Sequence, residues 1–177
     1  QVTVLVADHV EQVDALFAEG GHVLAELGEL HQGRKKVQPA GRVIREFYGE
    51  AAPRLLFPAP KFDAAAIAII GKAFGNVVET QSYTCYAGVV MPDHVHLLIR
   101  KHKHTAEEMI HHLREGSREL LIAASLRTTD HPVWCGGSGW KIFLDHPDEI
   151  RRTIKYIDDN PIPWRLPRQS WPFVKPY

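Results

Sequence analysis

At 177 residues the chain is long enough to form one domain with a buried core, and its length does not require a second domain. Its 21 Lys and Arg residues balance its 21 Asp and Glu residues, so a global positive charge does not indicate nucleic-acid binding, and polyanion contacts would need local clusters. The two cysteines are too few for a disulfide framework, and no apolar run is long enough for a membrane span, so the composition favours a cytoplasmic protein without membrane contact.

The N-terminal third of the chain predicts one strand and two helices. Residues 1–7 are rich in β-branched side chains, and their continuous apolar run favours a strand that is buried on both faces. Helical spacing of apolar residues predicts a helix that begins after Asp8 and ends at Gly20, and another over residues 40–51. Two prolines then interrupt the chain at 58 and 60, which separates this part from the middle of the chain.

The middle of the chain predicts a helix, a hairpin and a second helix. Asp63 is a good cap for a helix over residues 64–80, on which Gly71 and Gly75 share a face that would allow close approach to a sheet. A hairpin comes next, with strands over 83–91 and 94–99. Thr105 and Glu108 have the spacing of a capping box, which predicts a helix running to about residue 126.

The last third predicts a strand, a helix and an extended tail. Residues 140–144 are typical of a strand, and Pro147 with the acids after it is a strong helix start. Asn160 and Pro161 end that helix, because the residue before a proline is disfavoured in helical geometry. The remaining residues, 161–177, are punctuated by prolines and predict an extended segment.

The hairpin carries two histidines that could bind a metal ion. In a strand His94 and His96 point to the same side, with Cα atoms about 6.5–7 Å apart, while Val95 and Leu97 point to the other side. A rigid strand could therefore present both imidazoles to one cation. The alternative is a half-buried strand with two solvent-facing histidines, and the pair alone does not decide between the two.

Two polar side chains on the last helix lie near its apolar stripe. A step of 100° per residue places Tyr156 and Asn160 about 40° apart on the helix, beside the stripe formed by Ile150, Ile154 and Ile157. If the isoleucines dock the helix on the sheet, a phenol and an amide would lie at the edge of that contact. Taken separately, Tyr156 could be an amphipathic residue at a core margin and Asn160 a helix terminus before proline.

Basic and aromatic residues near these motifs are candidate contacts for nucleic acid. The aromatic candidates for stacking on unpaired bases are Trp134, Trp164 and Trp171, whereas we expect Trp140 in the core. Three of the basic residues leave the histidine strand at its active-site end, and three lie on the exposed side of the last helix. An equally good interpretation is a solvated charged face. These basic residues are Arg100, Lys101, Lys103, Arg151, Arg152 and Lys155.

The order and spacing of these motifs resemble the HUH single-tyrosine transposases, and within them the REP-associated tyrosine transposases. The resemblance is carried by the histidine hairpin 91–98, the long helix, the strand 140–144 and the stretch 156–161, and it runs from about residue 25 to Tyr177. Asp93 stands where many relatives have Asn, and residues 1–24 do not match the usual opening strand of the family.

The resemblance implies a single α+β domain over 1–177, with a divergent part (1–57), a catalytic core (58–160) and the C-terminal tail. The fold would be ferredoxin-like, an antiparallel sheet with helices packed on one face. His94, His96 and Asn160 would bind a divalent metal, Mg²⁺ or Mn²⁺, and Tyr156 would attack a phosphodiester of single-stranded DNA to give a phosphotyrosine and a free 3′ hydroxyl.

By the same resemblance, the partner would be hairpin-forming single-stranded DNA, which the protein would nick and rejoin as a monomer or a homodimer. In a homodimer, Tyr156 would serve its own histidines or those of a partner. Two other classes of function remain open at this point. One is a protein that binds DNA hairpins without catalysis, and the other is a metal-dependent hydrolase that uses water in place of the tyrosine.

Overall fold

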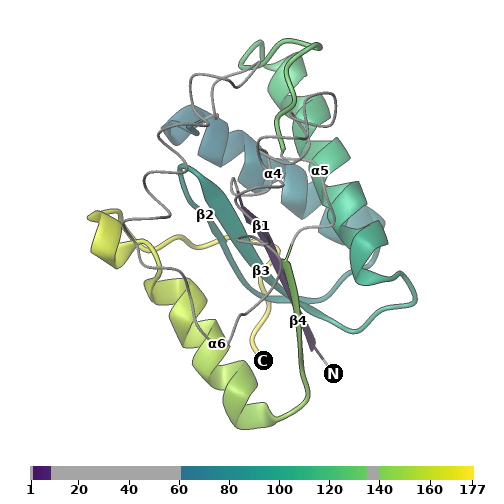
Figure 1. Cartoon of the computed structure of the whole chain (residues 1–177), viewed down its shortest axis with the longest axis vertical. Coiled ribbons are helices and arrows are strands. Elements are labelled where there is room, and N and C mark those ends of the chain that lie inside the picture. Colours follow the sequence, from purple (N-terminus) through teal and green to yellow (C-terminus); the bar gives the residue numbers. More distant parts are fainter. Residues whose placement is uncertain (1, 9–60, 135–139) are drawn as a thin grey trace, which may run out of the picture.

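The computed structural model of the chain describes residues 2–8, 61–134 and 140–177 (Figure 1). The predicted helices at 9–20 and 40–51, Cys135 and the division at residue 57 lie outside these ranges and stay predictions. In chain order the elements are β1 (Val2–Asp8), α4 (Ala64–Thr80), β2 (Cys85–Val90), β3 (His94–Arg100), α5 (Ala106–Ala123), β4 (Trp140–Leu144), α6 (Pro147–Asp159) and the 3₁₀ turn η3 (Ile162–Trp164).

The four strands form one antiparallel sheet in the order β2-β3-β1-β4. Together with α4 between β1 and β2, and α5 between β3 and β4, they give the β-α-β-β-α-β arrangement of ferredoxin-like folds. The predicted α+β class and antiparallel sheet are therefore confirmed. β1 lies between β3 and β4 in the middle of the sheet, as its continuous apolar sequence predicts.

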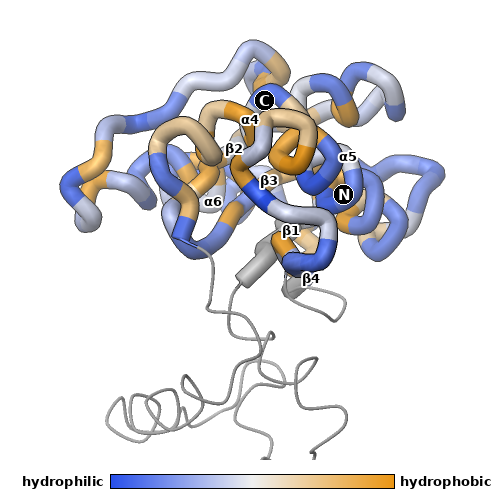
Figure 2. The backbone as a smooth tube through the Cα atoms, turned by 90° about the horizontal axis from the view of Figure 1, so that it is seen from above, coloured by the Kyte–Doolittle hydropathy of each residue, from blue (hydrophilic) through white to orange (hydrophobic). Residues whose placement is uncertain are grey.

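The helices cover both faces of the sheet rather than one. α4 and α5 pack on the face that carries Leu97, whereas α6 packs on the opposite face, where Ile150 and Ile157 join Leu98 in a second apolar cluster (Figure 1). The expectation of a shared face holds for α4 and α5 only. The helices also differ in composition, since α4 is apolar along most of its length and α6 is largely hydrophilic (Figure 2). A polar helix with two buried isoleucines can cover a sheet face and still expose most of its surface.

Local signals place the beginnings of α4 and α5 as predicted, whereas α5 ends at Ala123, before the predicted end near residue 126. The carboxylate of Asp63 accepts a hydrogen bond from the backbone N–H of Ala66 at 2.8 Å, and Thr105 and Glu108 make the reciprocal capping box. In the hairpin, the backbone N–H of Met91 donates to the carbonyl of His94 at 2.7 Å. The tight turn thus fixes where β3 begins, and with it which side each histidine faces.

The C-terminal segment after η3 covers the outer edge of β2 (Figure 1, yellow). The side-chain amide of Gln169 accepts from the backbone N–H of Val90 at 2.9 Å and donates to its carbonyl at 2.7 Å. Further along, the backbone N–H of Lys175 donates to the carbonyl of Cys85 at 2.8 Å, next to a parallel bridge at Val174. The extended tail thus satisfies backbone groups that an open strand edge would leave unpaired.

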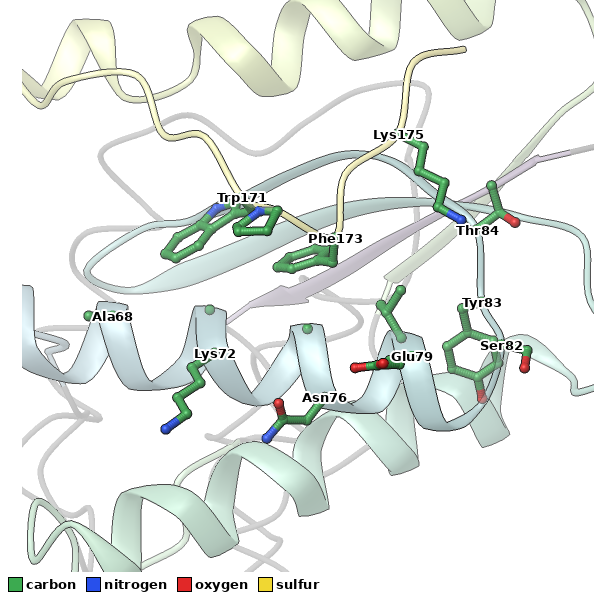
Figure 3. A pocket seen from close by; sticks show the side chains of 14 residues that line it. Ala68, Lys72, Asn76, Glu79, Ser82, Tyr83, Thr84, Trp171, Phe173 and Lys175 are labelled. Carbon is green, nitrogen blue, oxygen red and sulfur yellow. The ribbon is translucent and has the colours of Figure 1, made fainter.

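The two glycines of α4 face this segment and not the sheet. Figure 3 shows Trp171 and Phe173 lying against the helix, and a Cβ atom added at Gly71 would come within 2.1 Å of the Trp171 ring. The expected close approach is present, but the approaching group is an aromatic side chain from the C-terminus. The hollow beside these rings, about 770 Å³, is lined by none of the residues proposed for metal binding or nucleophilic attack.

None of the helices in the described ranges is long and apolar enough to cross a membrane.

Candidate active site

β3 presents both histidines toward α6. Its side chains alternate as predicted, with Val95, Leu97 and Ile99 in the cluster under α4 and α5. His96 is only 8% exposed, and burial, with a further contribution from neighbouring His94, lowers its pKa to about 4. A neutral imidazole keeps an unprotonated nitrogen, which is the form that binds a metal ion.

His94 is oriented by a carboxylate that sequence reasoning missed. Its Nδ1 lies 2.6 Å from Oδ1 of Asp93, the second turn residue of the hairpin, so Nδ1–H donates to the carboxylate and Nε2 points into the site. The sequence signal for this contact is an Asp directly before the first histidine of the strand.

α6 brings the two other predicted side chains to the histidines. Ile150 and Ile157 dock the helix on the sheet, and the adjoining face carries Tyr156 and, at the helix C-cap, Asn160. Oδ1 of Asn160 lies 3.3 Å from Nε2 of His94. The Tyr156 ring lies 5.6 Å from the His96 ring between centroids and is 59% exposed. Within one chain, the structure thus brings together all four residues proposed for metal binding and nucleophilic attack.

The donor set fits a cation. With Nδ1–H given to Asp93, Nε2 of a neutral His94 carries a lone pair, and the facing Asn160 oxygen is also an acceptor. Two acceptors 3.3 Å apart repel unless a cation or a proton lies between them, or unless the amide presents its NH₂ group. Nitrogen and oxygen donors suit Mn²⁺ and, less well, Mg²⁺. Among the described residues no group of three His, Cys, Asp or Glu side chains is arranged to hold a metal. In the set expected from the sequence, the third donor would be the side-chain amide of Asn160.

The basic residues divide into two groups. Arg151, Arg152 and Lys155 are exposed on α6, as predicted. Arg151 pairs with Asp148 at 3.0 Å and Lys155 with Asp159 at 2.7 Å. In the part of the chain that the structure describes, Arg152 has no ion-pair partner, and it lies one helical turn before Tyr156.

The other basic group lies away from the site. β3 begins at His94 and ends at Arg100, so Arg100 is about 20 Å from His94 along the strand. The prediction that Arg100, Lys101 and Lys103 leave the strand at its active-site end is wrong, because the strand carries them to the opposite end of the sheet. A role for them in DNA binding stays a prediction.

The three tryptophans proposed for base stacking have different environments. Trp134 packs between Phe62 and Phe74 and donates from Nε1 to the Ser117 hydroxyl at 2.9 Å, so its ring belongs to the core. Trp171 lies against α4. Trp164 is 53% exposed, and its ring centroid is 6.5 Å from that of His94.

A second group of histidines lies at the far end of the sheet. The Tyr83 hydroxyl is 3.0 Å from Nδ1 of His104 and 2.8 Å from Nδ1 of His112, and His102 packs edge-on against the same phenol. A phenol has one proton, so it donates to one imidazole and accepts from the other. His112 is therefore a hydrogen-bonded residue.

Comparison with solved structures gives matches to transposases. No protein-family profile matches the chain, and neither does a curated protein. The chain is similar to a REP-associated tyrosine transposase bound to a REP hairpin, at 18% identity and a TM-score of 0.47, over 62% of this chain and 64% of that one. It is also similar to a candidate transposase from Deinococcus radiodurans, at 14% identity and a TM-score of 0.36, over 90% of this chain and 87% of that one. The chain spans less than two thirds of the length of the first of these proteins.

Proposed function

We propose that this chain cuts and rejoins single-stranded DNA through a covalent bond to Tyr156, as a transposase or strand-transfer endonuclease. The observation that carries the proposal is the convergence of a phenol, an amide and two imidazoles from two elements. Tyr156 lies beside His96, and one helical turn later Asn160 contacts His94. The exposed phenol has access to a polymer that an enclosed pocket would exclude.

The reaction is a transfer and not a hydrolysis. Oη of Tyr156 forms a bond to the phosphorus of a phosphodiester, the bond from phosphorus to the 3′ oxygen breaks, and the phenolic proton is balanced by the proton that the leaving 3′ oxygen takes up. The products are a 5′-phosphotyrosine and a free 3′ hydroxyl. The same hydroxyl, or that of another strand, can reverse the step, so the strand is rejoined without an external energy source.

The residues of the site would have different roles in this reaction. His94, His96 and Asn160 would hold the cation, and Asp93 keeps the His94 ring turned toward it. A bound Mg²⁺ or Mn²⁺ would neutralise the charge of the phosphate and polarise it for attack. The isoleucines of α6 hold the phenol at one place over β3, which provides the orientation on which a transfer step depends.

The test is the covalent intermediate itself. A labelled single-stranded oligonucleotide with a hairpin, incubated with the protein and Mn²⁺, should give a protein–DNA band on a denaturing gel. Tyr156→Phe should abolish the band, since it removes only Oη and keeps the ring against His96. Tyr177→Phe is the matched control, because Tyr177 is comparably exposed at 49% and lies outside the site, so its band should persist.

Other outcomes identify other functions. Binding of the oligonucleotide without a covalent band would favour a DNA-hairpin-binding protein that has no catalytic activity. Cleavage that survives Tyr156→Phe would favour a hydrolase that uses water. Metal-dependent cleavage that is unchanged in His94→Ala would refute the assignment of the metal ligands.

A further inference from the structure

An indole lies exposed at the rim of the candidate active site. Trp164 is 53% exposed, and its ring centroid is 6.5 Å from that of His94, with 61° between the ring planes. The other two tryptophans with described side chains are at least half-covered by neighbouring rings and helices. Tryptophan is enriched among the residues that contribute most of the binding energy of interfaces.

The chain holds this indole in a fixed place. Trp164 ends the 3₁₀ turn that comes after Asn160, and the turn rests on Pro161, whose side chain is fully buried. The backbone N–H groups of Trp164 and Leu166 both donate to the Pro161 carbonyl, each at 3.1 Å. Arg165 closes the turn with a φ of 59°, a left-handed conformation that is unfavourable for a non-glycine residue. The ring is thus presented by a locally constrained backbone that is linked directly to a ligand residue.

The aromatic rings of the site form a row. Between centroids, Tyr156 to His96 is 5.6 Å, His96 to His94 is 4.8 Å, and His94 to Trp164 is 6.5 Å. The nucleophile lies beside one histidine and the exposed indole beside the other. A DNA strand whose phosphate is at the histidines therefore has a neighbouring nucleotide within reach of Trp164.

We propose that Trp164 is a stacking platform for an unpaired base next to the phosphate that Tyr156 attacks. The proposal rests on the proposed function, since it names the form of DNA that the same site accepts. A base inside a duplex has neighbours on both faces, whereas an unpaired base can leave the stack and lie on the indole. Trp164 would in this way position the strand and favour single-stranded DNA with little dependence on sequence, because every base has an aromatic face.

The experiment uses the Tyr156→Phe protein, which binds without cutting, and a single-stranded oligonucleotide in which 2-aminopurine replaces one base at a time. The fluorescence of 2-aminopurine is quenched when it stacks, so one position should be quenched on binding. Trp164→Ala should remove the quenching at that position and weaken binding about 5- to 100-fold. Trp164→Phe, which keeps an aromatic face, should keep part of the quenching and part of the affinity.

A matched set of controls separates stacking from other effects. Removing the base at the quenched position should weaken binding to the protein that has Trp164 and leave binding to Trp164→Ala unchanged, because the two changes remove the same contact. Phe143→Ala removes an equally exposed aromatic, 57% exposed, from β4. Phe143 lies opposite Thr3, which pairs with Ile99, about 17 Å along β3 from His94, so binding should not change.

The outcomes distinguish the two proposals. Trp164→Ala that binds with unchanged affinity and unchanged quenching would overturn the stacking role and leave strand transfer by Tyr156 intact. Quenching that depends on Trp164, in a protein whose wild type forms no covalent band, would support stacking and overturn the proposed chemistry. Failure of every oligonucleotide to bind would overturn both.

Discussion

Replacing Gly71 by alanine should loosen the C-terminal segment from α4. The added Cβ would lie 2.1 Å from Cζ3 and 2.3 Å from Cη2 of Trp171, much closer than non-bonded carbon atoms approach. Either the helix shifts or the indole swings out of its site. At Gly75 the nearest atom to an added Cβ is Cδ1 of Phe173 at 3.3 Å, which needs a shift of only a few tenths of an ångström.

Both substitutions increase the intrinsic stability of the helix, but they differ in the steric cost of the added methyl group. Alanine in place of glycine inside a helix stabilises it by about 1 kcal/mol. Overpacking of a well-filled contact costs about 1–3 kcal/mol, and losing the burial of a large side chain costs a similar amount. Gly71→Ala should therefore lower the free energy of unfolding by up to about 2 kcal/mol, which corresponds to a Tm lower by up to about 8 °C for a chain of this length. Gly75→Ala should be neutral or slightly stabilising.

Urea and thermal unfolding followed by circular dichroism would measure both variants. Gly71→Ala should also be measured in a protein that carries Trp171→Ala. Without the indole, the added methyl group meets no obstacle, so Gly71→Ala should then stabilise the protein like an ordinary helix substitution. The reasoning would be refuted if Gly71→Ala were as stable as Gly75→Ala, or if its cost persisted when Trp171 was absent.

Arg152→Ala should weaken binding of single-stranded DNA and reduce the slope of log Kd against log salt by about 0.7, whereas Arg151→Ala, which removes a cation already paired with a neighbouring carboxylate, should change the slope less. Asp93→Ala should weaken Mn²⁺ binding about 10- to 100-fold in a metal titration, since His94 loses the group that orients it, and an unchanged affinity would contradict that role. Burial lowers the pKa of His112, so the unfolded chain binds more protons than the folded chain in acid. The free energy of unfolding should therefore fall as pH drops from about 7 to about 5. An equally steep pH dependence in His112→Gln would count against this cause.

The sequence is sufficient to predict the elements whose ends depend on neighbouring residues. The helix capped by Asp63, the capping box that begins at Thr105 and the helix that starts at Pro147 all depend on contacts within a few residues. The same is true of the side to which His94 and His96 point, because alternation in a strand is a local property. These predictions are confirmed.

Contacts between distant parts of the chain could not be predicted in this way. The sequence does not distinguish the environments of the three tryptophans. Trp134 contacts Ser117 and two phenylalanine rings. Trp171 packs on a glycine of α4, and Trp164 lies at the rim of the candidate site. Their different burial depends on partners 17 to 100 residues away. The face of the sheet that α6 covers is likewise set by tertiary packing, since its isoleucine stripe would fit either side.

The wrong prediction for the basic residues after β3 has a simpler explanation. Arg100 lies six positions after His94 in the same strand, so the length of an extended chain alone separates them by about 20 Å. The geometry of the strand was sufficient to place Arg100, Lys101 and Lys103 at the far end of the sheet.

Cation binding at the proposed site and the docking of α6 on the sheet would stabilise each other. Two of the proposed ligand residues are on β3 and the third, Asn160, is at the C-cap of α6. A cation held by all three would bridge the strand and the helix, and it would stabilise the docked helix by the same free energy by which undocking weakens binding. The apolar contacts of Ile150 and Ile157, 3% and 0% exposed, then contribute to affinity from beneath the site. A substitution that loosens either isoleucine would weaken both cation and DNA binding without touching them.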